Sequence, residues 1–376
     1  MNYNIGIFTV ARSDYGILKK VIHQFSKQKE YKITLYIGSA HKSKIFGETN
    51  KEIEKKNVKE KFFKNNYVSS SIKTTIDYFS ETVQETNRLI SKDNLDAVII
   101  MGDRYEMLAI SFVCLNYNIP IIHLCGGSIT EGSLDDCYRY AISKMATLHL
   151  VETKHHKNNL IKSNIKKNIK LVGAPALENI SIDKYLKYKK IQSTKINLKE
   201  KPIISCFHPE TNLSVKDNLK NLKILLNFLK LTNENCFISY PNADDGFIDY
   251  IKFINKELKN NKKIHIVKSF GIKKYYKLLS EAKLMIGNSS SGIIETASFK
   301  LPCINLGNRQ KGRFSPRNVL HSRFNLKEIK KKYKIALGIK FIEKLKRYKN
   351  PYFKPDTSKL VIKYTKEVLK KKDIFA

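Results

Sequence analysis

The sequence lacks the features that mark membrane-spanning, metal-binding and repeat proteins. No apolar run approaches the roughly 18 residues that a membrane-spanning helix needs. The six cysteines are scattered without a CxxC pair or zinc-like spacing, and neither an internal repeat nor a heptad run is present. No secretory segment opens the chain, because Asn2, Tyr3 and Asn4 lead directly into an apolar strand. We therefore expect a soluble cytoplasmic protein with reduced thiols and no metal.

Acidic residues are also scarce. Only 34 Asp and Glu stand against 70 Lys and Arg, which gives a formal net charge of +36. This charge raises the question of whether the chain binds nucleic acid or membranes. Its lysines are dispersed, however, whereas nucleic-acid-binding modules concentrate charge on one face and interleave aromatic platforms. We expect no nucleic-acid partner and no stable membrane association, although the charge would steer an anionic substrate inward.

Length and periodicity predict two α/β domains. With 376 residues, of which 42% are hydrophobic, the chain can bury a large core. Short apolar strands alternate with amphipathic helices throughout, as is typical of doubly wound parallel sheets. Strands are expected at 5–10, 33–37, 97–101, 119–124, 148–151, 203–207, 236–240, 264–267, 284–286 and 303–306. Lys-rich helices are expected at 326–346 and 357–371.

The domain boundary is expected where the periodicity weakens. Residues 182–201 become Lys-rich and lose strong periodicity, so we place a linker there. This divides the chain into a Rossmann-like N-terminal domain (1–181), a Rossmann-like C-terminal domain (182–350) and a C-terminal helix (351–376). The last helix can pack back on the N-terminal domain.

The most informative stretch is 285–313, MIGNSSSGIIETASFKLPCINLGNRQKGR. A strand ends in GNSSSG, and a helix carrying Glu295 is expected to follow. Unpaired N–H groups and the dipole at a helix N-terminus bind phosphate, and the hydroxyls of Ser289 and Ser290 add donors. Glu295 would reach a ribose diol, while Arg309 and Arg313 supply cations. The alternative interpretation is a serine-capped helix in an ordinary α/β unit.

Two turns in the N-terminal half carry further charged groups after strands. Arg12 lies in ARSDYG and is placed to meet phosphate, because open α/β sheets bind ligands at the carboxyl ends of their strands. Asp103 and Arg104 follow another strand in GDRYE. The alternatives are an exposed, solvated arginine and an aspartate that caps a helix.

A glycine pair breaks the next strand and leads to a charged helix. Gly126 and Gly127 permit close backbone approach to a ligand. Asp135 and Asp136 then open a helix that also bears Arg139. Acidic residues in the first turn commonly stabilise a helix by interacting with its dipole. This is the alternative to a catalytic role.

Taken together, these motifs resemble the hydrolysing UDP-N-acetylglucosamine 2-epimerases of sialic-acid biosynthesis. The resemblance covers nearly the whole chain: ARSDYG at 11, GDRYE at 102, HLCGG at 123, DDCYRYAISK at 135, HPET at 208, YPNADDG at 240, and GNSSSGIIE with INLGNRQKGR after 286. It implies a GT-B fold, in which two Rossmann-like domains with doubly wound parallel sheets surround a central cleft. It further implies a homodimer or homotetramer without metal or redox cofactor.

The resemblance also implies roles for individual residues. The contacts to the UDP-sugar would be Arg12, Arg104, His208, Asn242, Ser289, Ser290, Glu295 and Arg309, and Arg313 joins them from its place in the motif. Asp103 and Asp135 match acids that act at the sugar. Asp136 and Arg139 match residues of the sugar pocket.

The implied reaction is elimination followed by hydration. A base removes the C2 proton of the sugar while UDP leaves C1, and water adds to the resulting 2-acetamidoglucal to release N-acetylmannosamine. Because the C2 proton is barely acidic, the base needs a partly desolvated position and the departing diphosphate needs cations and helix N–H groups.

The sugar end departs from the family pattern. Many members read HIEGGE where this chain reads HLCGGS, so Cys125 and Ser128 replace two acids, and Tyr140 replaces a histidine. Glu131 can restore a carboxylate, or it is a solvated loop residue. The altered pocket suggests a different sugar, such as the UDP- or GDP-linked 2,4-diacetamido-2,4,6-trideoxyglucose of legionaminic-acid synthesis, or else a loss of catalytic efficiency.

Other functions stay open at this point. A GT-B glycosyltransferase at the inner membrane face would suit the basic charge, but it predicts an apolar docking patch in the N-terminal domain, which the sequence does not display. A non-hydrolysing epimerase would return UDP-linked sugar. A nucleotide-sugar sensor or a nucleic-acid binder would perform no chemistry, and salt-dependent binding to random DNA would indicate the latter.

Overall fold

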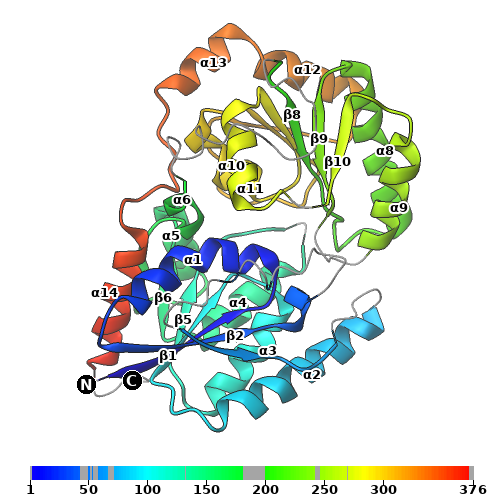
Figure 1. The fold of residues 1–376 in the computed structure, drawn as a ribbon. Coiled ribbons are helices and arrows are strands. Elements are labelled where there is room, and N and C mark those ends of the chain that lie inside the picture. Colours follow the sequence, from blue (N-terminus) through cyan, green and yellow to red (C-terminus); the bar gives the residue numbers. More distant parts are fainter. Residues whose placement is uncertain are drawn as a thin grey trace. The chain divides into compact units, whose positions relative to one another are not determined.

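The computed structural model describes residues 2–42, 50, 53, 58–66, 72–131, 133–180, 200–241, 246–268 and 270–371, with the side chains of residues 12 and 13 outside the description. The chain divides into two compact units (Figure 1). Unit 1 comprises Met1–Ile129, Asp135–Asn179 and Tyr352–Ala376, and unit 2 comprises Thr130–Leu134 and Ile180–Pro351. The expected linker at 182–201 lies almost entirely outside the described residues.

Unit 1 is a parallel sheet covered by helices on both faces. Its strands are β1 (Tyr3–Thr9), β2 (Tyr31–Ile37), β3 (Lys59–Phe62), β4 (Ala97–Met101), β5 (Ile121–Leu124), β6 (Leu148–Val151) and β7 (Ile169–Leu171). Its helices are α1 (Arg12–Ser26), η1 (Ser39–Lys42), α2 (Ile72–Ile90), α3 (Tyr105–Asn116), α4 (Asp135–Met145), α5 (Lys154–Lys162), α6 (Pro175–Glu178) and α14 (Thr357–Leu369). The sheet order is β3-β2-β1-β4-β5-β6-β7.

Unit 2 repeats this architecture with six parallel strands. They are β8 (Ile203–Cys206), β9 (Cys236–Ser239), β10 (Ile264–Val267), β11 (Leu284–Gly287), β12 (Cys303–Leu306) and β13 (Val319–Ser322), in the order β10-β9-β8-β11-β12-β13. Its helices are α8 (Val215–Thr232), α9 (Phe247–Leu258), α10 (Ile272–Glu281), α11 (Ser291–Ile294), η4 (Thr296–Phe299), α12 (Leu326–Ala336) and α13 (Ile339–Lys346). Two doubly wound parallel-sheet domains are therefore confirmed.

The central strands are apolar along their whole length because helices cover both of their faces. In β4, Ala97, Ile99 and Met101 pack into one hydrophobic cluster with α1 and α14. Val98 and Ile100 point to the opposite face and pack with α3. All five residues of the strand are buried, so each face contributes its own core.

Both sheets have a topological switch point, where successive strands begin to add on the other side. In unit 1, β1 pairs with β2 on one side and with β4 on the other. In unit 2, β8 lies in the same way between β9 and β11. Ligands of open α/β sheets bind outside the carboxyl ends of the strands at such points. The segments after β1 and β4, and after β8 and β11, are therefore where the sequence motifs should act.

Two strands were missed and two local expectations were wrong. The short edge strands β3 and β13 were not predicted, since KEKF and VLHS carry too few apolar residues to be read as strands. The helix expected at 326–346 is two helices, because the chain turns at Leu337 and Gly338. The helix expected to carry Glu295 is the single turn α11, followed by the 3-10 helix η4.

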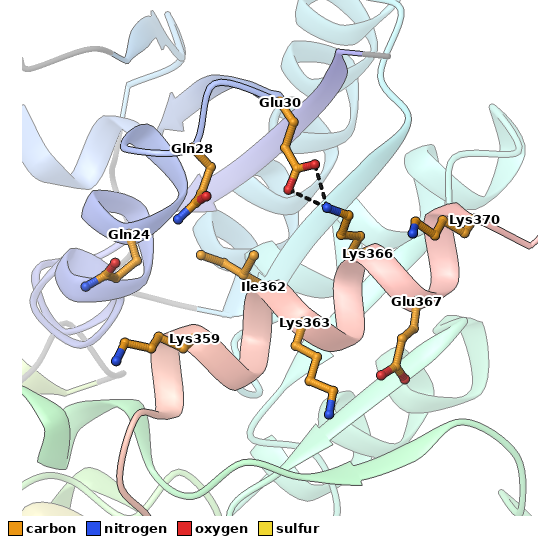
Figure 2. A pocket seen from close by; sticks show the side chains of 9 residues that line it. All are labelled: Gln24, Gln28, Glu30, Lys359, Ile362, Lys363, Lys366, Glu367 and Lys370. Atoms are coloured by element: carbon orange, nitrogen blue, oxygen red, sulfur yellow. Dashed lines mark hydrogen bonds and ion pairs between the residues drawn. The ribbon is translucent and has the colours of Figure 1, made fainter.

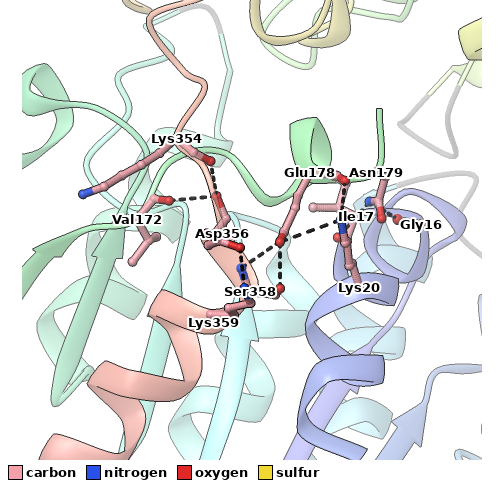
Figure 3. A network of polar contacts seen from close by, with 11 residues as sticks. Gly16, Ile17, Lys20, Val172, Glu178, Asn179, Lys354, Asp356, Ser358 and Lys359 are labelled. Carbon is pink, nitrogen blue, oxygen red and sulfur yellow. Dashed lines mark hydrogen bonds and ion pairs between the residues drawn. The ribbon is translucent and has the colours of Figure 1, made fainter. Parts of the chain in front are cut away.

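The C-terminal helix α14 belongs to unit 1, where it packs against α1, α6 and β6. Its start is held by a buried polar contact (Figure 3). The carboxylate of Glu178 accepts hydrogen bonds from the Ser358 backbone N–H at 2.7 Å and from the Ser358 hydroxyl at 2.8 Å. Lys20 of α1 lies 3.8 Å from the same carboxylate. None of the helices in the described part of the chain combines the length and the apolar character needed to cross a bilayer.

This contact yields a stability prediction. Glu178→Ala removes the acceptor from two part-buried donors of Ser358, so it should lower the free energy of unfolding by about 2–4 kcal/mol. Urea denaturation followed by circular dichroism measures the change. The control is Glu367→Ala on the same helix, whose carboxylate is 45% exposed and 3.9 Å from Lys170; it should cost less than about 1 kcal/mol. Equal costs for the two variants would contradict the anchoring role.

Candidate functional site

In unit 2, the ends of β8 and β11 are held together by a close backbone approach at Gly287 and by the buried side-chain amide of Asn288. Gly287 ends β11 with φ +152°, and a β-carbon there would lie 2.0 Å from the carbonyl oxygen of Cys206. The next residue, Asn288, is fully buried. Its side chain accepts from the His208 N–H at 2.7 Å and donates to the His208 carbonyl at 2.8 Å. These contacts fix His208 and the serine turn beside each other at the switch point.

The serine turn does not form the capped helix considered above. Ser290 precedes α11 but makes no side-chain capping hydrogen bond, and α11 is only one turn long. The Ser289 hydroxyl accepts a 3.4 Å contact from the N–H of Ser291. This places Ser289 and Ser290 in the turn directly after β11, as expected, but the contribution of a long helix dipole is absent.

Glu295 is the titratable group at the base of this turn. Its carboxylate accepts from the Ser291 hydroxyl at 2.5 Å and from the Tyr276 hydroxyl at 3.4 Å. Tyr275 also bonds to Ser291. Burial raises the pKa of Glu295 to about 7, against the lowering effect of the bonds from Ser291 and Tyr276. Glu295 therefore holds its proton more tightly than an exposed glutamate does.

The loop after β12 brings cations to the same turn. Arg309 and Gln310 both donate to the carbonyl oxygen of Asn288, at 3.4 and 3.0 Å. Glu210 supports this loop, since its carboxylate accepts from the Asn308 N–H at 3.2 Å; burial raises its pKa, and the N–H groups of Asn308 and Arg309 oppose the shift. Arg313 has a buried Nε with no hydrogen-bond partner among the described residues.

In unit 1, a buried arginine organises the acids. Arg139 is 1% exposed and donates to the Asp136 carboxylate and to the Ser128 carbonyl at 2.8 and 2.9 Å. It also bonds to Asp103, which follows β4. Burial opposes the charge of Arg139, but Asp103, Asp135 and Asp136 outweigh it and raise the pKa of the guanidinium. The structure thus brings the acids of two motifs, 32 or more residues apart, to one cation.

This arrangement rules out one simple explanation of Asp103. The residue that caps α3 is Arg104, without a side-chain capping bond, so Asp103 is not a helix cap. Its side chain stays 26% exposed while it contacts the buried Arg139. A carboxylate that is oriented on one side and accessible on the other can reach a substrate.

The glycine pair is needed for the geometry of the same loop. Gly127 has φ +77°, and a β-carbon there would meet the His156 carbonyl oxygen at 2.3 Å. Ser128, where the resemblance implies an acid, is 1% exposed, and its hydroxyl has no hydrogen-bond partner among the described residues. Cys125 is partly exposed and has φ +64°. The two altered positions therefore carry a thiol and a buried neutral hydroxyl.

Arg104 is part of a second charged cluster at the end of β4. It donates to both carboxylate oxygens of the fully buried Glu106, at 3.1 and 2.8 Å. Its charge lies near Asp14, whose pKa burial raises to about 6 although Arg104 lowers it. Burial, and then Arg104, lowers the pKa of His41 to about 4. Arg104 is thus held rigidly beside the switch point.

Two other predicted positions have a structural explanation. The Glu131 carboxylate is 51% exposed and lies 2.7 Å from the Lys311 ammonium group, which favours its interpretation as a solvated loop residue of unit 2. Tyr140 packs against the apolar side chains of Val151, Leu160 and Ile169. Burial, and then Asp136, raises its pKa.

Two predicted positions lie outside the description, namely Asn242 and the side chain of Arg12. Conversely, sequence reasoning did not assign roles to Asn288, Glu106 or Tyr276, and His123 was only part of a motif. His123 bridges the Gly102 carbonyl and the Ser143 hydroxyl at 2.8 and 3.0 Å, and burial lowers its pKa to about 4. Asn288 and Glu106 stand inside the quoted motifs, so their place after a strand was an available signal.

A separate cavity of 460 Å³ lies along α1 and α14 (Figure 2). In it, Lys366 donates to both carboxylate oxygens of Glu30, at 2.9 and 2.7 Å. None of the predicted site residues lines this cavity. Among the described residues, no cluster of His, Cys, Asp and Glu is arranged to hold a metal ion.

The fold and the placement of the motifs define the class of the protein. Two Rossmann-like domains, each with polar and charged side chains after its switch-point strands, form the GT-B architecture.

Comparison with known proteins identifies the family. Residues 23–366 match the family model for UDP-N-acetylglucosamine 2-epimerase. The chain is 34% identical over 336 residues to the GDP/UDP-N,N'-diacetylbacillosamine 2-epimerase (hydrolyzing) of Campylobacter jejuni, covering 85% of this chain and 84% of that protein. It is 30% identical to the polysialic acid biosynthesis protein P7 of Escherichia coli, covering 97% and 94%. The chain therefore belongs to the UDP-N-acetylglucosamine 2-epimerase family, as its motifs indicated, and is a nucleotide-sugar 2-epimerase.

A solved structure supports the fold independently. The UDP-GlcNAc 2-epimerase from Neisseria meningitidis, crystallised with UDP-GlcNAc, superposes with a TM-score of 0.78 at 17% identity, covering 98% of this chain and all of that one. At this identity the likeness concerns the fold alone, and it confirms the GT-B assignment.

The raised pKa of Glu295 predicts a pH-dependent stability. Its folded-state pKa of about 7 exceeds the ordinary 4.5, so the native state binds the proton more tightly. The stability that this proton contributes is present below about pH 4.5 and is lost as pH rises through 7, on the order of 3 kcal/mol in total. Glu295→Gln stays neutral, so without ligand its melting temperature should rise relative to the wild type as pH increases.

The control is Glu257→Gln, because Lys230 lowers the pKa of Glu257, which is the opposite shift. That variant should gain nothing over the wild type at high pH. Thermal melts from pH 5 to 8.5 make the comparison. Parallel curves for Glu295→Gln and the wild type would show that Glu295 does not hold the proton.

Proposed function

We propose that the protein is a hydrolysing 2-epimerase, which converts a UDP-linked 2-acetamido sugar and water into UDP and the free 2-epimer. A base removes the C2 proton, UDP leaves C1, and water then adds to C1 of the 2-acetamidoglucal while C2 is protonated from the other face. Two relatives whose names specify a hydrolyzing 2-epimerase support this reaction, those of Campylobacter jejuni and Legionella pneumophila.

One observation carries the proposal, namely the buried Arg139 that holds Asp103 and Asp136. A carboxylate base for a weakly acidic proton must be fixed in position and partly removed from water. Asp103 meets both conditions, because Arg139 orients it and 26% of its side chain stays exposed. Asp135, in the first turn of α4, is the second acid and would serve on the other side of the sugar ring.

Unit 2 would bind the nucleotide. In the proposal, Glu295 takes the ribose hydroxyls, and the turn of Ser289 and Ser290 takes the diphosphate together with Arg309 and His208. Glu295 is suited to this role, since ribose hydroxyls can donate to its carboxylate. The remaining proposed contacts are Arg313, whose Nε is buried, and Arg12, Arg104 and Asn242.

The altered sugar pocket favours a second candidate substrate. In the proposal, Cys125 and Ser128 stand in place of two acids near the sugar, so this end of the site would carry less negative charge. A 2,4-diacetamido-6-deoxy sugar offers fewer hydroxyl groups than N-acetylglucosamine and suits such a pocket. The names of the Campylobacter and Legionella relatives, which specify N,N'-diacetylbacillosamine, support this candidate. N-acetylmannosamine from UDP-N-acetylglucosamine remains the first candidate product, for sialic-acid synthesis.

A proton NMR time course in heavy water tests both substrates. The enzyme is incubated separately with UDP-N-acetylglucosamine and with its 2,4-diacetamido-6-deoxy analogue. We expect a free manno-configured sugar with deuterium at C2 and stoichiometric UDP from at least one of them. An epimer that remains linked to UDP would instead indicate the non-hydrolysing reaction. No turnover of either substrate while UDP binds would overturn the epimerase proposal in favour of a glycosyltransferase.

Two variants separate the candidate acids. Asp103→Asn preserves shape but removes the base, so kcat should fall by about 10²–10⁴ while UDP binding stays unchanged. Glu131→Gln serves as the matched control, because its carboxylate is paired with Lys311 and half exposed; kcat should stay within about threefold. Steady-state kinetics and calorimetric titration with UDP make the measurements. A larger loss from Glu131→Gln than from Asp103→Asn would assign the base to Glu131.

A further inference from the structure

Outside the candidate site, unit 2 exposes a basic surface that also carries apolar side chains. This α12–α13 surface consists of the exposed residues Lys327, Lys330, Lys331, Lys334, Ile335, Ile339, Lys340, Ile342, Lys344 and Lys346. Figure 1 shows both helices, in orange, along the outside of unit 2.

The charge of this surface exceeds the general lysine enrichment of the chain. Residues 327–349 include ten Lys and Arg among 23 residues, compared with 70 among 376 for the whole sequence. Only Glu328 and Glu343 oppose them. Both already pair with basic groups, with Arg323 at 3.7 Å and with Lys346 at 2.6 Å. The positive charge of the surface is therefore largely uncompensated in the described structure.

The three isoleucines of the surface stand at and just after the turn between the two helices. The N–H of Gly338 donates to the Ile335 carbonyl and the N–H of Ile342 donates to the Gly338 carbonyl, both at 3.1 Å. Ile335 and Ile339 therefore flank a tight turn, and Ile342 follows Ile339 by one helical turn. Their exposed fractions are 42%, 80% and 36%. Leaving three neighbouring isoleucines in water is unfavourable, by up to about 1.5–3 kcal/mol for each fully exposed side chain.

Packing of the hydrophobic core of unit 2 does not account for these exposed isoleucines. The inner face of α12 packs into the core of unit 2 through Ile329 and Ala336, and α13 buries Leu345. Lys327, Lys331 and Lys334 lie on the opposite face of α12. The outer face of the two helices is therefore itself mixed, because it carries both isoleucine and lysine side chains.

We propose that the α12–α13 surface docks the protein reversibly on an anionic lipid membrane. The three isoleucines would enter the headgroup region, and the lysines around them would meet lipid phosphates. Nucleic acid would satisfy the lysines equally but would leave the isoleucines exposed. The proposal does not rest on the epimerase reaction, because no residue of the α12–α13 surface belongs to the candidate site.

Vesicle sedimentation tests the docking. The full chain is mixed with phosphatidylcholine vesicles, with or without phosphatidylglycerol, at low and high salt. We expect binding only to the anionic vesicles at low salt. Changing Lys331, Lys334 and Lys340 together to Gln should weaken the binding by at least about tenfold. Equal binding to both kinds of vesicle, or no binding to either, would overturn the proposal.

The matched control changes Lys252 and Lys256 on the exposed face of α9, together with its C-cap Lys259, to Gln, which removes the same charge. This variant should bind anionic vesicles as the wild type does, and an equal loss would assign the binding to bulk charge. Ile339→Ser, at an 80% exposed position, should fold normally, weaken vesicle binding severalfold and leave salt-dependent binding to random DNA unchanged. No effect of Ile339→Ser on vesicle binding would overturn lipid insertion.

Discussion

The buried charge of Arg139 is the constraint on which the acidic end of the candidate site depends. Removing a guanidinium from water is costly unless opposite charge and hydrogen-bond acceptors surround it. Here the compensation comes from three places: Asp103 after β4, Asp136 in α4, and the carbonyl of Ser128 in the loop between them. Because each partner is needed, the strand end, the loop and the helix hold one another in register. A change in any one of them removes part of the compensation of the buried charge.

In unit 2, the strand ends at the candidate site are held together by a neutral side chain, that of Asn288. Asn288 satisfies both the N–H and the carbonyl of His208, while its own carbonyl takes the donors of Arg309 and Gln310. A carboxylate is nevertheless buried nearby, because Glu210 is 2% exposed; burial raises its pKa, and the charge of Arg309 opposes that shift. Glu295 is a second buried carboxyl group, and burial raises its pKa to about 7.

The sequence predicted the central parts of the fold well, for a physical reason. Strands such as β4 and β6 are buried on both faces, so their apolar runs have sharp ends, and the expected bounds 97–101 and 148–151 agree with the structure. The edge strand β3 has one solvated side and reads as Lys-Glu-Lys-Phe, which carries no such signal. Motifs placed after well-defined strands were therefore located reliably, whereas the strand order that makes two of those ends switch points could not be read from local pattern.

The local sequence could not predict which residues contact the side chains of the candidate site. That Asp103 meets Arg139, 36 residues later, follows from the pairing of β4 with β5 and from the glycines that turn the chain towards α4. The same geometry separates two acids that look alike in the sequence: Asp136 turns to the buried arginine, while Glu131 turns to Lys311. The neutral side chain of Ser128 is also consistent with these contacts. A carboxylate at this position would add a further negative charge beside an arginine on which three aspartates already act.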